Sequence, residues 1–198
     1  DINIRLINAM VEDRKGDIWI ITDHYGVFRI EDKTGRYHLL ANTANKKLKT
    51  ALYDKKNDEL WLGDYFGNLY SYNIGNRTWK TYSFRNGKDA VHAHSIYDIV
   101  VMNDRMYIGT DKGVYIFDPK EETDISRHIN GYENMVFTMY PGRDGRLWIG
   151  GNGLWIYSES DGMMHEERLG TIQCAGIDMD DKEHICVATI GYGMIILS

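Results

Sequence analysis

The sequence has 198 residues and a formal net charge of −6, and its Lys and Arg residues form no long basic block. Nucleic-acid surfaces normally carry clustered basic side chains, and the short basic stretch at 45–49 is a poor candidate, so we expect no nucleic-acid partner for this segment. No stretch approaches the roughly 18 apolar residues that a membrane span requires, and we therefore expect no membrane contact by this segment.

A short strand with a central aromatic residue recurs along the chain. In chain order the copies occupy residues 17–22, 59–64, 105–110, 146–151 and 184–189, the last with Cys186 in the aromatic position. Counted from Trp19, the steps between copies are 42, 46, 41 and 38 residues. A period near 40 with β content is typical of propeller blades of four strands each. The sequence therefore predicts an all-β fold, a β-propeller with about five four-stranded antiparallel blades.

The segments around each copy fit the other strands of a blade. An apolar strand and a polar turn rich in Gly, Asn and Asp come before it, and these residues accept the positive φ angles of tight hairpins. A short loop ending in Gly and a third strand come after it. The fourth strand is more polar, as in residues 36–40 and 79–82, which suits an outer edge strand. The loop glycines are Gly26, Gly67, Gly113, Gly153 and Gly193.

These elements predict one propeller domain over residues 1–198. The expected blades lie near 5–44, 47–85, 94–130, 133–169 and 171–198, and the last blade is incomplete. The chain opens without Met or a signal peptide and stops after a third strand. We therefore expect a piece of a larger propeller, with five imperfectly closed blades as the alternative.

Four aromatic residues and two cysteines carry further structural predictions. Blades bury their faces against their neighbours, so Trp19, Trp61, Tyr107 and Trp148 are expected in the core between blades, without a functional role. Cys174 and Cys186 fall on adjacent antiparallel strands. With a tight turn at 180–183, Ile177 would face Cys186 and Cys174 would point to the other side of the sheet. Two buried thiols are therefore expected in place of a disulfide.

The repeat resembles a known family at four places. Residues 11–20 and 142–150 carry its Asp-Arg-x-Gly-x-Leu-Trp-Ile-Gly core, residues 112–119 its Gly-aromatic-Asp-Pro half, and residues 130–136 its linker between blades. Together these segments resemble the two-component regulator propeller repeat, over nearly the whole chain. The departures are Ile21 and Ala188 where the family has Gly, Cys186 where it has Trp, and the second and third linkers.

This resemblance implies a function and a location. The family is found mostly in the extracytoplasmic sensors of bacterial hybrid two-component proteins, where propellers precede an immunoglobulin-like domain, a membrane span, a histidine kinase and often a DNA-binding receiver. Such sensors typically respond to oligosaccharides. The resemblance thus implies a periplasmic, non-catalytic module of an inner-membrane protein, acting in a phosphorelay that regulates transcription. Its partners would be an oligosaccharide or other small ligand and the rest of the sensor.

The loops between second and third strands are the candidate ligand site, because they all emerge on one face of a propeller. Aromatic rings offer flat apolar faces to sugars, and carboxylates or amides bind hydroxyl groups. Alternatively, the Asp residues only bind loop backbone and the aromatic residues cap the core. The candidate residues are Asp23, His24, Tyr25, Asp64, Tyr65, Phe66, Asp111, Lys112, Asn152 and Tyr192.

Catalytic and metal chemistry have little support in the sequence. His92 and His94 share one side of an extended segment, but no third ligand lies nearby, so a solvated loop is expected in place of a metal site. No nucleophile or phosphate-loop motif occurs, and we expect no catalytic residues and no cofactor.

Two alternatives to the sensor stay open. One is a structural or interaction propeller that mediates dimer assembly, since an open arc would leave two apolar blade faces exposed. The other is a propeller enzyme acting on carbohydrate or lactone.

Overall fold

The computed structural model describes residues 6–84, 94–121, 124–125 and 127–197. These residues form five antiparallel sheets and no helix, which confirms the predicted all-β class and the blade pattern. The described part of the chain accordingly contains no helix long and apolar enough to cross a membrane. The chain divides into two compact units, residues 1–96 and 97–198. Its description as one domain stays a prediction.

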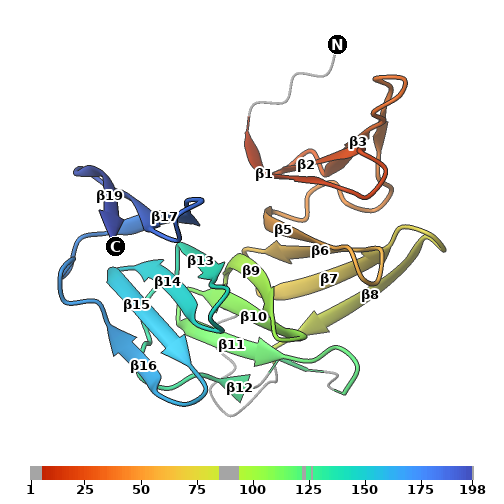
Figure 1. Ribbon diagram of the computed structural model, residues 1–198. Coiled ribbons are helices and arrows are strands. Elements are labelled where there is room, and N and C mark those ends of the chain that lie inside the picture. The colour runs from red at the N-terminus through yellow and green to blue at the C-terminus, as the bar shows by residue number, and fades with distance from the viewer. Residues whose placement is uncertain (1–5, 85–93, 122–123, 126, 198) are drawn as a thin grey trace. The chain divides into compact units, whose positions relative to one another are not determined.

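The first unit contains two four-stranded sheets that lie face to face, with their first strands side by side (Figure 1). Each sheet runs in chain order, as expected for a propeller blade. Blade 1 comprises β1 (Ile7–Glu12), β2 (Ile18–Thr22), β3 (Val27–Ile30) and β4 (Tyr37–Leu39). Blade 2 comprises β5 (Leu48–Asp54), β6 (Glu59–Asp64), β7 (Asn68–Asn73) and β8 (Thr78–Ser83).

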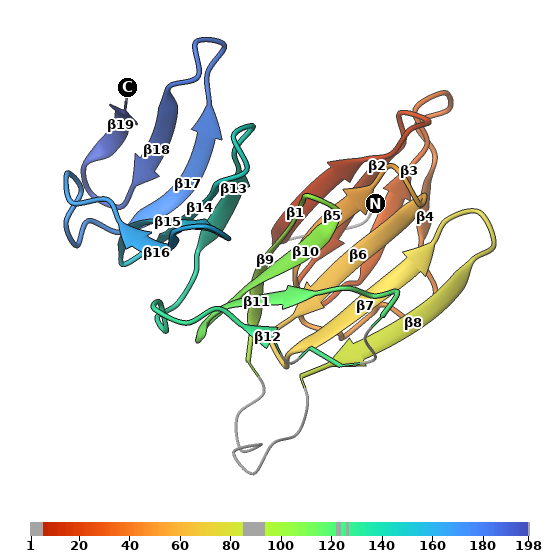
Figure 2. The same cartoon turned by 60° about the horizontal axis from the view of Figure 1, so that its bottom comes forward.

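The second unit contains two sheets of four strands and one of three, again in chain order (Figure 2). Blade 3 comprises β9 (Ile96–Met102), β10 (Arg105–Thr110), β11 (Gly113–Phe117) and β12 (Arg127–His128). Blade 4 comprises β13 (Thr138–Pro141), β14 (Leu147–Gly151), β15 (Gly153–Ser158) and β16 (Gly162–His165). Blade 5 comprises β17 (Cys174–Met179), β18 (Ile185–Thr189) and β19 (Gly193–Leu197).

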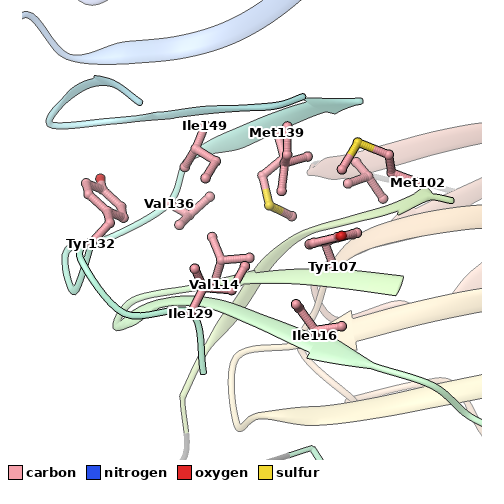
Figure 3. Close-up of a cluster of buried hydrophobic side chains, with 11 residues drawn as sticks. Met102, Tyr107, Val114, Ile116, Ile129, Tyr132, Val136, Met139 and Ile149 are labelled. Carbon is pink, nitrogen blue, oxygen red and sulfur yellow. The ribbon is translucent and has the colours of Figure 1, made fainter. Parts of the chain in front are cut away.

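The core of each unit lies between neighbouring blades. Figure 3 shows Tyr107 and Val114 of blade 3 pointing toward Val136, Met139 and Ile149 from the next linker and blade 4. In the first unit, residues of β2 and β3 form one buried cluster with residues of β5, β6 and β7. Each sheet therefore depends on its neighbour to cover its apolar face, as in other repeat proteins.

The predicted core aromatics are buried at three of four positions. Trp19 and Trp61 are 2% exposed and Tyr107 is fully buried. Trp148 packs against the cluster shared by blades 4 and 5, as predicted, but it is only half-buried there. Blade 5 has three strands and offers Trp148 a smaller covering surface than the four-stranded sheets provide.

The cysteines differ from the prediction in register and burial. Cys186 pairs with Asp178, and Ile177 pairs with Val187, because the hairpin loop contains one residue more than the tight turn that was assumed. Glu183 takes a positive φ of 66° within this loop. Both thiols are free, but only Cys174 is buried, and this burial raises the pKa of its thiol to about 11.

Polar side chains of the first strands link neighbouring blades. In the first unit, Asn8 Nδ2 donates to Leu48 O of β5 at 2.6 Å. In the second, Asp98 Oδ2 of β9 accepts from Met139 N of β13 at 2.6 Å, and its Oδ1 accepts from Ile99 N at 2.8 Å. Burial raises the pKa of the Asp98 carboxyl to about 6, against an ordinary value of 3.8, although these two backbone hydrogen bonds act in the opposite direction.

Asp98 is expected to make stability depend on pH. Because its folded pKa of about 6 lies above its ordinary value of 3.8, the folded protein binds the proton more tightly, and this contribution is lost as pH rises through that interval. The loss is on the order of 2 kcal/mol, since one pKa unit corresponds to about 1.4 kcal/mol. Urea unfolding of the wild type and Asp98→Asn between pH 4 and 7.5 measures it. The wild type should lose stability relative to the variant as pH rises, and parallel profiles would contradict the assignment.

Candidate ligand-binding face

In blades 1, 3 and 5 the loop between the second and third strands is a short hairpin closed by a threonine and a glycine. Thr22 Oγ1 donates to Gly26 O at 2.7 Å, Thr110 Oγ1 to Gly113 O at 2.9 Å and Thr189 Oγ1 to Gly193 O at 2.7 Å. The glycines take positive φ angles, a conformation that costs other residues steric strain. Each loop therefore holds its side chains close to the end of its sheet.

The blade 1 loop combines a carboxylate, an imidazole and a phenol ring. His24 Nδ1 lies 2.5 Å from Asp23 Oδ2, and Tyr25 is 45% exposed. The other oxygen of Asp23, Oδ1, is buried and has no hydrogen-bond partner among the described residues. A buried acceptor of this kind is costly unless a donor reaches it. The loop thus offers an exposed ring beside unused hydrogen-bonding capacity.

The blade 2 loop is organised around Asp64. This residue is 1% exposed, and its Oδ1 accepts from Phe66 N and Asn68 N, both at 2.8 Å. Its Oδ2 accepts from Asn68 Nδ2 at 2.8 Å and Tyr70 Oη at 2.9 Å. Burial and the adjacent carboxylate raise the pKa of Tyr70, so this phenol keeps its proton and donates. Asp64 therefore supports the loop, while Phe66, at 57% exposed, presents its ring to solvent.

The linker between blades 1 and 2 joins these two loops. Asn45 N donates to His24 O at 2.9 Å, and Tyr65 N donates to Lys47 O at 3.2 Å. Lys49 Nζ lies 5.7 Å from the centre of the half-buried Tyr65 ring, within the range of a cation–π contact. The loops at 23–25 and 64–66 are thus tied to one linker, with lysines beside them. The sequence signal for this linker is the basic stretch at 45–49, whose composition by itself suggests only a poor nucleic-acid candidate.

The second unit repeats this arrangement with other residues. Lys112, Asn152 and Tyr192 are exposed, Tyr192 at 71%, whereas Asp111 is half-buried. The linker after blade 3 accepts a hydrogen bond from Gly113 N at Asn134 O (3.0 Å) and one from Asn152 N at Tyr132 Oη (3.3 Å). The linker after blade 4 accepts from Gly153 N at Ile172 O (3.2 Å) and from Ile190 N at Gln173 O (2.9 Å). Each linker again binds the loops on both sides of it.

Metal ligands are not gathered in the described part of the chain. Among those residues no group of three or more His, Cys, Asp or Glu side chains could hold a metal ion. His92 of the sequence pair lies outside the described residues, and His94 lies inside them, at the start of the segment that leads to β9.

Comparison with known proteins adds a family and a fold. Residues 133–153 match the family model described as two component regulator propeller. The matched segment covers the start of the fourth copy of the repeat, with the linker before it. This match confirms the resemblance predicted from the fourth copy of the repeat. A search of curated proteins gave no match.

Solved structures share the propeller fold at low sequence identity. An extracellular domain from B. thetaiotaomicron assigned to the hybrid two component system BT3049 matches with TM-score 0.75 and 18% identity, covering 97% of this chain and 26% of that one. A second such domain, of BT4673, matches with TM-score 0.73 and 18% identity, covering 99% and 32%. Virginiamycin B lyase from Staphylococcus aureus matches with TM-score 0.73 and 14% identity. This match covers 97% of this chain and 69% of the lyase chain. The chain therefore spans about a quarter to a third of the length of the two extracellular domains.

Proposed function

We propose that this chain is the ligand-sensing part of a periplasmic propeller in a membrane-bound two-component sensor and is not catalytic itself. The observation that carries the proposal is the family match at residues 133–153, within a fold shared with extracellular domains assigned to hybrid two component systems. Its output would be a ligand-dependent bias in the arrangement of domains, passed to a kinase outside this chain.

The proposed ligand is an oligosaccharide bound at the loops between second and third strands. Tyr25, Phe66 and Tyr192 expose between 45% and 71% of their surface at the loop ends of their sheets, where sugar rings could stack on them. His24, Lys112 and Asn152 supply polar groups for hydroxyls. Asp64 is not proposed as a ligand contact, because its four hydrogen bonds stay within its own hairpin. Its proposed role is to hold Phe66 in position.

Thermal unfolding against a panel of plant and host oligosaccharides at millimolar concentration tests this site. A ligand at 100 times its dissociation constant should stabilise the chain by about 2.7 kcal/mol, a shift visible in the melting curve. Tyr25→Ser combined with Phe66→Ser should leave the unliganded melt nearly unchanged, because both rings are exposed. It should weaken binding roughly tenfold, since aromatic contacts contribute about 0.5 to 1.5 kcal/mol each.

The matched control is Tyr37→Ser, which removes a ring of 55% exposure from β4, away from the loops. This variant should bind the active sugar as the wild type does. Equal loss of binding in the control and the double variant would contradict the loop face, and a panel in which no sugar shifts the melt would contradict the sensor proposal.

An interaction propeller is the second candidate, favoured by one observation. Met194 and Ile196 of β19 are 67% and 54% exposed, and Met10 of β1 is 63% exposed. Such apolar side chains on a sheet would favour pairing with a second copy or with further blades. Light scattering tests self-association, and a molecular mass that stays monomeric at all concentrations would contradict pairing of copies. A propeller enzyme remains the third candidate, since one of the matched folds is that of a lyase.

A further inference from the structure

A groove opens between blades 1 and 2, on β3, β4, β7 and β8, and none of the candidate loop residues lines it. Its volume is about 510 Å³, within the usual range for small-molecule sites. The groove exists because β4 has three residues, all exposed, whereas the facing β8 has six, so the short strand leaves part of the opposite sheet uncovered. Its lining includes Trp19, Arg29, Glu31, Asn42, Tyr72, Arg77 and Trp79.

Aromatic rings form the inner wall of the groove. The ring centres of Trp19 and Tyr72 are 6.1 Å apart, and those of Tyr72 and Trp79 are 4.7 Å apart. Trp19 and Tyr72 are nearly buried, at 2% and 6% exposure, so the half-buried Trp79 is the ring available to a ligand. A flat apolar face at the side of a cleft suits a sugar or another flat ring.

The groove also carries hydrogen-bond donors without partners. Among the described residues, Trp79 Nε1, Tyr72 Oη, the Asn42 amide and the Arg77 guanidinium form no side-chain hydrogen bond or ion pair. The other charged groups are already paired, because Arg29 binds Asp17 and Glu31 accepts from Thr34 and contacts His38. A ligand with hydrogen-bond acceptors would pair with these donors, and an anionic one would pair with Arg77.

We propose that this groove binds a carboxylated sugar ring. The apolar side of the ring would stack on Trp79, the carboxylate would accept hydrogen bonds from Arg77, and the hydroxyls would bind Asn42 and Tyr72. A neutral sugar would leave the Arg77 charge without a counterion, and an aromatic carboxylate would leave the amide and phenol unused. None of the loop candidates lines the groove, so this proposal can be tested independently of the proposed function.

Calorimetric titration with a digalacturonate at low salt tests the groove, with neutral galactobiose and benzoate as comparison ligands. Arg77→Asn should weaken digalacturonate binding at least tenfold, since hydrogen bonds to charged groups contribute about 1.5 to 3 kcal/mol. Asparagine is chosen because Arg77 has a φ of 61°, a left-handed conformation that Asn tolerates. Trp79→Phe keeps a ring and should lose less affinity than Trp79→Leu.

Arg36→Asn is the matched control, because Arg36 is an exposed arginine near β4 that does not line the groove. It should bind digalacturonate with unchanged affinity. Equal affinities of Arg77→Asn and wild type, or no binding by the wild type, would overturn the proposal, as would benzoate or galactobiose binding as tightly as digalacturonate. Binding lost in the Tyr25→Ser, Phe66→Ser variant but kept in Arg77→Asn would also overturn the groove and would assign the acidic sugar to the loop face.

Discussion

Replacing Asp64 by alanine is expected to lower the free energy of unfolding by about 3 to 5 kcal/mol, since each buried donor left without an acceptor costs about 1 to 3 kcal/mol. The carboxylate accepts from two backbone N–H groups, the Asn68 amide and the Tyr70 hydroxyl, and the residue is 1% exposed. Among the described residues, Tyr70 Oη donates to no acceptor other than Asp64.

Urea unfolding of Asp64→Ala measures this loss, with Asp54→Ala as the control in the same sheet. Asp54 also accepts from turn N–H groups, at Lys56 N and Asn57 N, but those hydrogen bonds are exposed to water, which can replace them. The control should cost about 1 kcal/mol or less. Equal stability of the two variants would contradict the role of Asp64 as the support of its loop. It would instead favour a direct contact between Asp64 and the ligand.

Gly150→Val is expected to lower the free energy of unfolding by about 3 kcal/mol, near the upper end for overpacking a core. A Cβ built on Gly150 would lie 2.7 Å from both Cys174 O and Thr138 Cγ2. Cys174 O is a backbone atom of the neighbouring blade and cannot rotate away as a side chain can. Gly109 has the same position in blade 3, where a Cβ would lie 2.7 Å from Val136 Cγ1.

Gly75→Val is the control, because Gly75 is exposed in the β7–β8 turn and an added Cβ would meet nothing closer than Asn73 Oδ1 at 3.5 Å. Thermal or urea unfolding should show a small change for Gly75→Val and a large one for Gly150→Val. A Gly150→Val protein as stable as the control would mean that blades 4 and 5 can separate without cost.

The sequence by itself determined the blade pattern, because hairpins follow from local chemistry. The loop glycines Gly67, Gly113 and Gly153, which mark the end of each loop in the sequence, take φ angles of 78°, 93° and 86°. The recurrence of the same strand pattern at a period near 40 then specified antiparallel sheets in chain order. The sequence did not specify the length of the last hairpin loop. The loop has one residue more than predicted, so Cys186 pairs with Asp178 and not with Ile177.

Only the tertiary structure decided what the candidate side chains do. Asp23 and Asp64 occupy neighbouring positions in their repeats, yet Asp64 uses both oxygens within its hairpin while Asp23 Oδ1 has no partner among the described residues. Likewise, nothing in the spacing indicated that Trp79 and Arg77 would border a groove with Asn42, because that groove depends on the length of β4 in the adjacent blade. Periodicity reports the strands within one blade, whereas burial, hydrogen-bond partners and clefts arise where two blades meet, between residues far apart in the chain.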